Sequence, residues 1–266
     1  MAAQRAVLLD PDLAEGWVSW GVLAFEADRD WITGELALKR AIELKPSNAY
    51  ARAMLGDMLR NQGRVKEAIE QQRLALELDP LSPVIHGVLG ISLTAAHRFD
   101  EGRARFEHTL ASGGDQAAAL AFLFLSGPLL GLNGDEMADH GVRLARLLDA
   151  EDPESAAVIG HAFASDGTDP QLMSEARDAA DRLVADSVFT VRQIAALYTR
   201  LGDPETALQW LEGASIEDDL SLSIVGTDPA LDPLRDDPRM QRLMDELGLP
   251  NGYDPAADAY EPGSQR

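Results

Sequence analysis

The chain has 266 residues, of which 45% are hydrophobic, with 45 acidic residues, 23 basic residues and no cysteine. The lack of cysteine excludes disulfides and thiolate metal sites, and the net charge of −22 argues against direct binding of nucleic acid. The apolar run Leu120–Leu132 is too short to span a bilayer.

The charge is concentrated in the second half of the chain. Residues 1–114 carry 13 basic and 16 acidic groups, whereas residues 115–266 carry 10 and 29. Such a surface would tolerate a basic partner, although a role in solubility is the simpler interpretation. The N-terminus lacks the apolar core of a secretion signal. We therefore expect a cytoplasmic protein, or a periplasmic one if the chain was cut from a membrane-anchored parent.

Residues 1–13 have the pattern of the second helix of a pair whose first helix is missing. Ala6, followed by Asp10-Pro11, matches Ala75, followed by Asp79-Pro80. Solenoids usually begin with a capping helix rather than with half a unit. Either the chain comes from a longer protein, or another subunit covers this helix.

Residues 14–114 contain three regular copies of one pattern. In the clearest copy, 49–80, Gly63 separates two helical segments and Pro80 follows Pro46 after 34 residues. Gly56 and Ala68 are small where the two helices would cross. In the first copy one residue is inserted near positions 28–30. The pattern closely resembles the tetratricopeptide repeat.

The resemblance implies an all-α fold, a right-handed α-solenoid of about six helix-turn-helix hairpins with a C-terminal capping helix. Residues 115–186 read as degenerate repeats, and 187–218 return to the regular pattern, so we expect the solenoid to span 1–218. In residues 115–132 the first helix is expected to kink or end at Pro128.

Residues 219–250 differ from the repeats and are predicted to cap the last hairpin. Asp237 and Pro238 begin a helix there. This part resembles the segment that follows the repeats of bacterial winged-helix or adenylate-cyclase signalling proteins, and the resemblance covers residues 188–250. Residues 251–266 lack apolar periodicity and are expected to be disordered.

No pattern in the chain predicts catalysis or a cofactor. It has neither a glycine-rich phosphate loop nor a nucleophile elbow. Glu136 and His140 lie one helical turn apart, but two ligands are too few for a structural metal site. We therefore expect no enzyme activity, no cofactor and no metal.

The resemblance places binding on the first helices of the hairpins, which line a concave face in that family. The corresponding residues are Glu15, Val18, Val22, Phe25, Tyr50, Ala53, Asp57, Arg60, Asn61, Val84 and Ile91. The carboxylate clamp of the chaperone-binding members is missing, since Val22, Asp57 and Ile91 occupy its positions. Other parts of this chain, or a second copy of it, are alternative occupants of the face.

Glu15, Glu26 and Asp57 beside Tyr50 and Arg60 would suit an extended peptide with a basic side chain. The leading interpretation is a non-catalytic scaffold that binds a protein or peptide in the concave groove. The alternative is the sensory region of a bacterial signalling or transcriptional regulator, separated from its output domain.

Overall fold

The computed structural model describes residues 2–165, 167, 169–186, 189–214 and 219–249. Within these ranges every regular element is a helix, which confirms the predicted all-α class. The α-helices are α1 (Ala2–Leu9), α2 (Ala14–Glu26), α3 (Trp31–Leu44), α4 (Ala49–Asn61), α5 (Val65–Leu78), α6 (Pro83–Ala95), α7 (Phe99–Ala111), α8 (Gln116–Leu125), α9 (Gly134–Leu147), α10 (Ser155–Ala164), α11 (Pro170–Ala185), α12 (Val191–Arg200), α13 (Pro204–Glu212) and α14 (Pro238–Glu246). The 3₁₀ helices are η1 (Leu220–Ile224) and η2 (Pro229–Leu234). The expected disordered tail, 251–266, lies outside the described residues.

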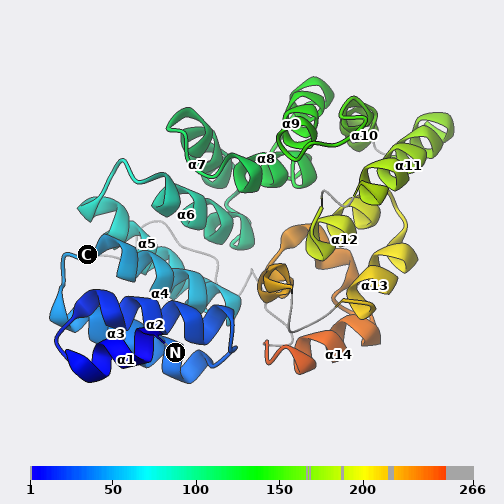
Figure 1. Cartoon of the computed structure of the whole chain (residues 1–266). Helices are drawn as coiled ribbons and strands as arrows, with labels where there is room; N and C mark the ends of the chain where they lie inside the picture. The colour runs from blue at the N-terminus through cyan, green and yellow to red at the C-terminus, as the bar shows by residue number, and fades with distance from the viewer. Residues whose placement is uncertain (1, 166, 168, 187–188, 215–218, 250–266) are drawn as a thin grey trace, which may run out of the picture.

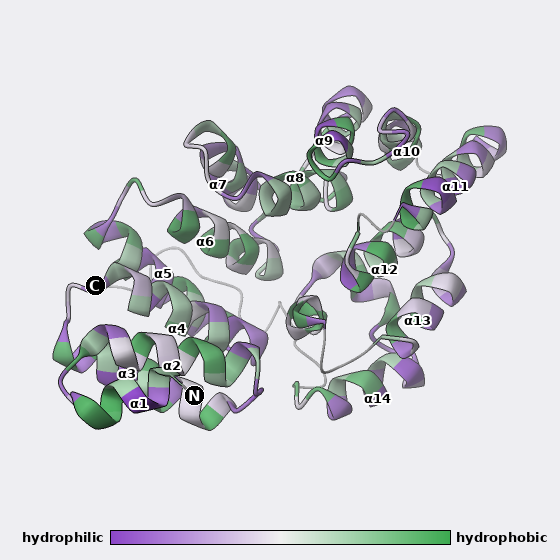
Figure 2. Ribbon diagram, in the orientation of Figure 1, coloured by the Kyte–Doolittle hydropathy of each residue, from purple (hydrophilic) through white to green (hydrophobic). Residues whose placement is uncertain are grey.

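From α1 to α13, each helix packs against the one that follows it. Figure 1 shows that the helices follow a curved path, with α2 and α4 at one end and α12 and α13 at the other. Hydrophobic and hydrophilic patches occur on the same helices (Figure 2), as expected where each helix buries one stripe. The predicted solenoid of helical hairpins is therefore confirmed. Helix α8 ends at Leu125, and Pro128 lies in the turn beyond it.

A residue in the left-handed conformation follows the first helix of each regular hairpin. Gly63, between α4 and α5, has a φ of 72°, which glycine adopts readily because it has no Cβ. Arg29 and His97 occupy the same point in the neighbouring hairpins, with φ values of 50° and 56°. The linker from α2 to α3 spans residues 27–30, one residue more than the linker from α4 to α5, as the sequence predicted.

The two helices of a hairpin cross closely at glycine. A Cβ added to Gly56 would lie 2.6 Å from Gln72 Cγ and 2.8 Å from the carbonyl oxygen of Ala68. Real Cβ contacts do not occur below 3.0 Å, so the crossing of α4 and α5 at this point requires glycine. The expectation that Gly56 and Ala68 mark the crossing is confirmed.

A recurrent side-chain hydrogen bond joins each repeat to the next one. Trp17 Nε1 donates to the carbonyl oxygen of Pro11 at 2.8 Å, and Arg52 Nε donates to that of Pro46 at 3.3 Å. His86 Nε2 lies 3.0 Å from the Pro80 carbonyl oxygen. In each case the donor lies six residues after the proline. The contact satisfies a carbonyl group just beyond the end of the preceding helix, where no intrahelical donor is available.

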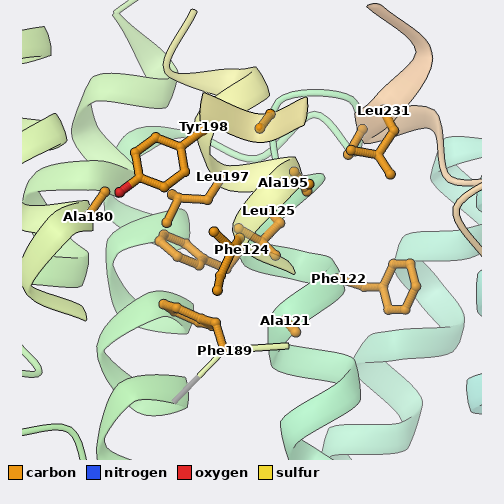
Figure 3. Packing of buried hydrophobic residues seen from close by; sticks show 14 of the residues in the cluster. Ala121, Phe122, Phe124, Leu125, Ala180, Phe189, Ala195, Leu197, Tyr198 and Leu231 are labelled. Atoms are coloured by element: carbon orange, nitrogen blue, oxygen red, sulfur yellow. The ribbon is translucent and has the colours of Figure 1, made fainter. Parts of the chain in front are cut away.

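The hydrophobic core is continuous through the second half of the chain. One cluster of buried side chains extends from Phe106 in α7 to Leu249. In Figure 3 the side chains of Phe124, Leu197 and Tyr198 lie together, and Leu231 of the C-terminal segment belongs to the same cluster. A separate cluster connects the first hairpins. The degenerate repeats therefore share one core with residues that follow the last hairpin.

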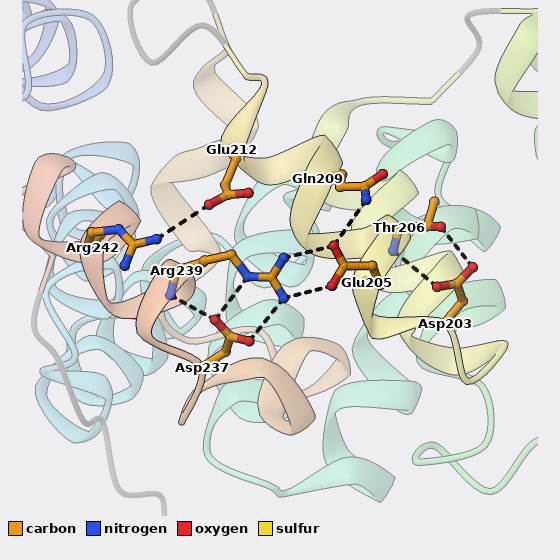
Figure 4. Close-up of polar contacts among 8 residues, drawn as sticks. All are labelled: Asp203, Glu205, Thr206, Gln209, Glu212, Asp237, Arg239 and Arg242. Atoms are coloured by element: carbon orange, nitrogen blue, oxygen red, sulfur yellow. Dashed lines mark hydrogen bonds and ion pairs between the residues drawn. The ribbon is translucent and has the colours of Figure 1, made fainter.

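Residues 219–249, the C-terminal segment, are tied firmly to the last hairpin. Helix η2 packs on α12, and α14 packs on α13. Arg192 Nη1 of α12 lies 2.5 Å from Asp228 Oδ2, and both side chains are buried. Arg239 of α14 donates to both carboxylate oxygens of Glu205 on α13, each at 3.0 Å (Figure 4). The segment also reaches across the curve, because η1 packs against α4 (Figure 1).

Candidate functional site

Equivalent residues of α2, α4 and α6 differ in exposure according to their place along the helix. Glu15, Tyr50 and Val84, in the first turns, are exposed. One turn or two further on, Val22, Asp57 and Ile91 are partly exposed. The other residues that the sequence placed on the concave face lie beneath the surface: Val18, Phe25, Ala53, Arg60 and Asn61. The accessible part of the face is therefore the first turn of each helix, and it extends in part to Val22, Asp57 and Ile91.

The buried polar residues of α4 contact one another, although Nε and Nη1 of Arg60 make no hydrogen bond within the described residues. Arg60 is only 1% exposed, and its Nη1 lies 2.7 Å from Asp57 Oδ1. Its Nη2 donates to Asn61 Oδ1 at 2.6 Å. The charge of Asp57 is thus partly committed to Arg60, because a buried guanidinium requires a counter-ion. Charge reversal at either residue would perturb the fold as well as the surface.

An acidic corner lies where α2 and α4 meet. Burial, and then the charge of Asp57, raise the pKa of Glu26 above its ordinary value. Tyr50 is exposed overall, but partial burial raises the pKa of its phenol, and the charges of Glu26 and Asp57 add to the shift. Glu15 is separate from this corner, since its carboxylate accepts a hydrogen bond from Lys45 Nζ at 2.8 Å. Glu26 remains a half-buried carboxylate whose pKa is not lowered by any positive neighbour among the described residues.

Replacement of Glu26 by glutamine is expected to stabilise the fold at neutral pH. The folded protein holds the Glu26 proton more tightly than the unfolded chain does, because the folded pKa is raised. The native residue therefore contributes stability at low pH that is lost as the pH rises above about 4.5. Urea unfolding at pH 4.5 and pH 7.5 would measure this difference. Glu70→Gln, a change at an exposed residue of α5, is the control, and its stability should depend on pH as that of the native chain does. If the stability of Glu26→Gln also had the pH dependence of the native chain, the assignment would be contradicted.

An apolar cavity of about 200 Å³ opens between α6 and α8. Val84, Val88 and Ile91 of α6 form one wall, and Ala118 and Phe122 of α8 form the other. The cavity thus contains two residues that the sequence placed on the concave face, Val84 and Ile91. It also contains two that the sequence did not single out, Ala118 and Phe122. The only sequence signal for Ala118 and Phe122 was the apolar character of residues 116–125, which predicts a buried helix but not a cavity.

The described residues contain no group of three or more potential ligands that could hold a metal ion. Glu136, considered with His140 in the sequence, instead forms an ion pair with Arg103 at 2.8 Å. No helix within the described ranges is long and apolar enough to cross a membrane.

Comparison with known proteins identifies one tetratricopeptide repeat in the chain and several structures with a similar fold. Residues 37–70, from α3 to α5, match the tetratricopeptide repeat family model. The fold is similar to PilF of Pseudomonas aeruginosa, with 18% identity, 88% of this chain and 97% of that chain covered, and a TM-score of 0.55. PilW, described as a widely conserved type IV pilus biogenesis factor, shares 12% identity over 87% of this chain and 98% of that chain, with a TM-score of 0.55.

A third similar structure is a chain of the APC/C hetero-tetramer Cut9–Hcn1. It shares 15% identity over 92% of this chain but 45% of that chain, with a TM-score of 0.57. No curated protein matches the sequence. At these identities the likeness shows the fold alone. The resemblance of residues 188–250 to signalling proteins is not tested by these comparisons and stays a prediction.

Proposed function

We propose that this chain is a non-catalytic interaction module of the tetratricopeptide-repeat kind, and that it binds an extended segment of another protein along α2, α4 and α6. The observation that carries the proposal is the apolar cavity beside Val84, which opens on the face formed by the exposed starts of these helices. Concave, mostly apolar sites with a few polar groups are typical of ligand binding.

The two ends of this face suit different side chains. An apolar side chain of the ligand would fill the cavity against Val88 and Phe122. A lysine or arginine would lie near Glu26, Tyr50 and Asp57, because no positive partner among the described residues offsets the partial burial of Glu26. The ligand is thus expected to carry an apolar anchor and a basic residue, separated by the span from α6 to α2.

Selection of short peptides from a random display library on the native chain would test the proposal. For a selected peptide, Val84→Glu is expected to weaken binding at least about tenfold, or ~1.4 kcal/mol, because a carboxylate would enter the apolar cavity. Isothermal titration calorimetry would measure the affinity. Val84 is 48% exposed, so this variant should remain folded.

Ile32→Glu is the matched control, because Ile32 lies on α3 and is 76% exposed. It introduces the same charge outside the proposed face and should leave the affinity unchanged. Glu26→Gln should weaken only those peptides that carry a basic residue, and more so at low salt. Peptides that bind all three variants as they bind the native chain would refute the proposal.

A further inference from the structure

The C-terminal segment is held very differently on its two sides. On the side of α12 its contacts are buried. Asp228 is fully buried against Arg192, whose guanidinium also lies 4.9 Å from the centre of the Phe122 ring. Leu222, Val225 and Leu231 belong to the same core as α12 and α8. These contacts make the segment and the last hairpin one unit.

On the side of the first three hairpins the contacts are fewer and partly exposed, and Trp31 is only partly buried against the core. We call this boundary the seam. His97, in the turn between α6 and α7, lies 3.2 Å from Asp232 of η2, and their side chains are 39% and 33% exposed. Helix η1 packs against α4. A Cβ at Gly248 would lie 3.5 Å from Trp31 Nε1, which places the end of the segment beside the first hairpin.

The seam therefore joins residues of all three regular hairpins to a segment that belongs to the far end of the solenoid. Exposed ion pairs contribute little to stability, whereas buried pairs and a shared apolar core resist separation. Where a structure opens locally, it opens at the region with the fewest buried contacts. That region is the seam rather than the boundary of the segment with α12 and α13.

We propose that residues 219–249 act as an internal strap across the curve of the solenoid. The strap opens at the seam while it stays attached to α12 and α13, and opening uncovers α4. Its gating role rests on the proposed function, because α4 is the middle helix of the binding face. In the closed state the strap limits the room for a ligand that follows the face from α2 to α6, and the contact is thus autoinhibitory.

Hydrogen exchange with mass spectrometry would test the opening without any ligand. His97→Asn removes the ring that faces Asp232, and asparagine tolerates the left-handed turn. We expect exchange in peptides that cover α4 and η1 to be at least threefold faster in this variant. Exchange in α12 and α13 should not change. Unchanged exchange in α4 and η1 would overturn the proposal.

Asp149→Asn is the matched control, because Asp149 also has a left-handed φ, 57°, in a turn between helices outside the seam. It should leave exchange in α4 unaltered. General acceleration throughout His97→Asn, including α12, would also overturn the proposal, since it would indicate global destabilisation rather than opening at the seam.

A closed strap can be tested separately, because the chain has no cysteine. His97→Cys/Asp232→Cys bridged by a short bismaleimide should slow exchange in α4 and slow the association of a selected peptide at least threefold. Peptide association that is unaffected by the bridge would overturn the gating role. Failure of any peptide to bind either state would refute the proposed function and leave the exchange result to decide whether the seam opens.

Discussion

Asp228→Ala is expected to lower the free energy of unfolding by about 3–5 kcal/mol. The substitution leaves the Arg192 guanidinium buried with no carboxylate at 2.5 Å, and an uncompensated buried charge is costly. It also removes the side chain that accepts the backbone N–H of Ala230 at 2.9 Å at the start of η2. Urea unfolding followed by circular dichroism would measure the loss, and Tm should fall by roughly 2–4 °C per kcal/mol.

The matched control is Asp236→Ala, which removes an exposed carboxylate from the same segment and should change stability by less than about 0.5 kcal/mol. The double variant Arg192→Leu/Asp228→Leu should be more stable than Arg192→Leu or Asp228→Leu alone, because it leaves no unpaired charge. Additive losses in this cycle would show that the two residues do not stabilise the fold as a pair.

Gly160→Ala is expected to destabilise the fold by about 1–3 kcal/mol, although alanine is the better helix former. A Cβ at this position in α10 would lie 2.5 Å from the backbone nitrogen of Ala138 and 2.8 Å from its Cα. Backbone atoms of α9 cannot move aside as the end of a flexible side chain can, so the two helices must separate. Thermal unfolding of the variant would report the change.

Gly87→Ala, at a glycine in α6, is expected to have the opposite effect on stability. The nearest atom to an added Cβ is Thr109 Oγ1 at 4.0 Å, which leaves room for the methyl group. Stability should therefore rise by about 0.5–1 kcal/mol, the difference in helix propensity between glycine and alanine. If Gly160→Ala raised Tm as Gly87→Ala is expected to do, the close crossing of α9 and α10 would be in error.

The geometry also constrains how the proposed binding face should be mutated. The sequence alone suggests Asp57 and Arg60 as residues to mutate, but Arg60 is buried and paired with Asp57. Loss of binding in variants of either residue could therefore reflect a perturbed fold. Val84 and Glu26 test the same face with less risk, because neither takes part in a buried ion pair within the described structure.

Much of the architecture follows from local patterns in the amino-acid sequence. The 34-residue spacing of Pro46 and Pro80 and the small residues Gly56 and Ala68 were enough to predict helical hairpins that stack. These signals are reliable because each hairpin contacts mainly its neighbours. The turn at Gly63 and the extra residue between α2 and α3 belong to the same local information.

The accessible surface depends instead on contacts between distant parts of the chain. No local pattern pairs Arg192 with Asp228 or His97 with Asp232, and no local pattern makes Phe122 a wall of the same cavity as Val84. The contact of His97 with Asp232 arises because the chain curves until its last residues meet its first hairpins, whereas the other two contacts join neighbouring elements. Repeat spacing therefore specified the hairpins and their order, whereas only the tertiary structure shows that residues 219–249 return across the curve and bury their apolar side chains in the core that begins in α7.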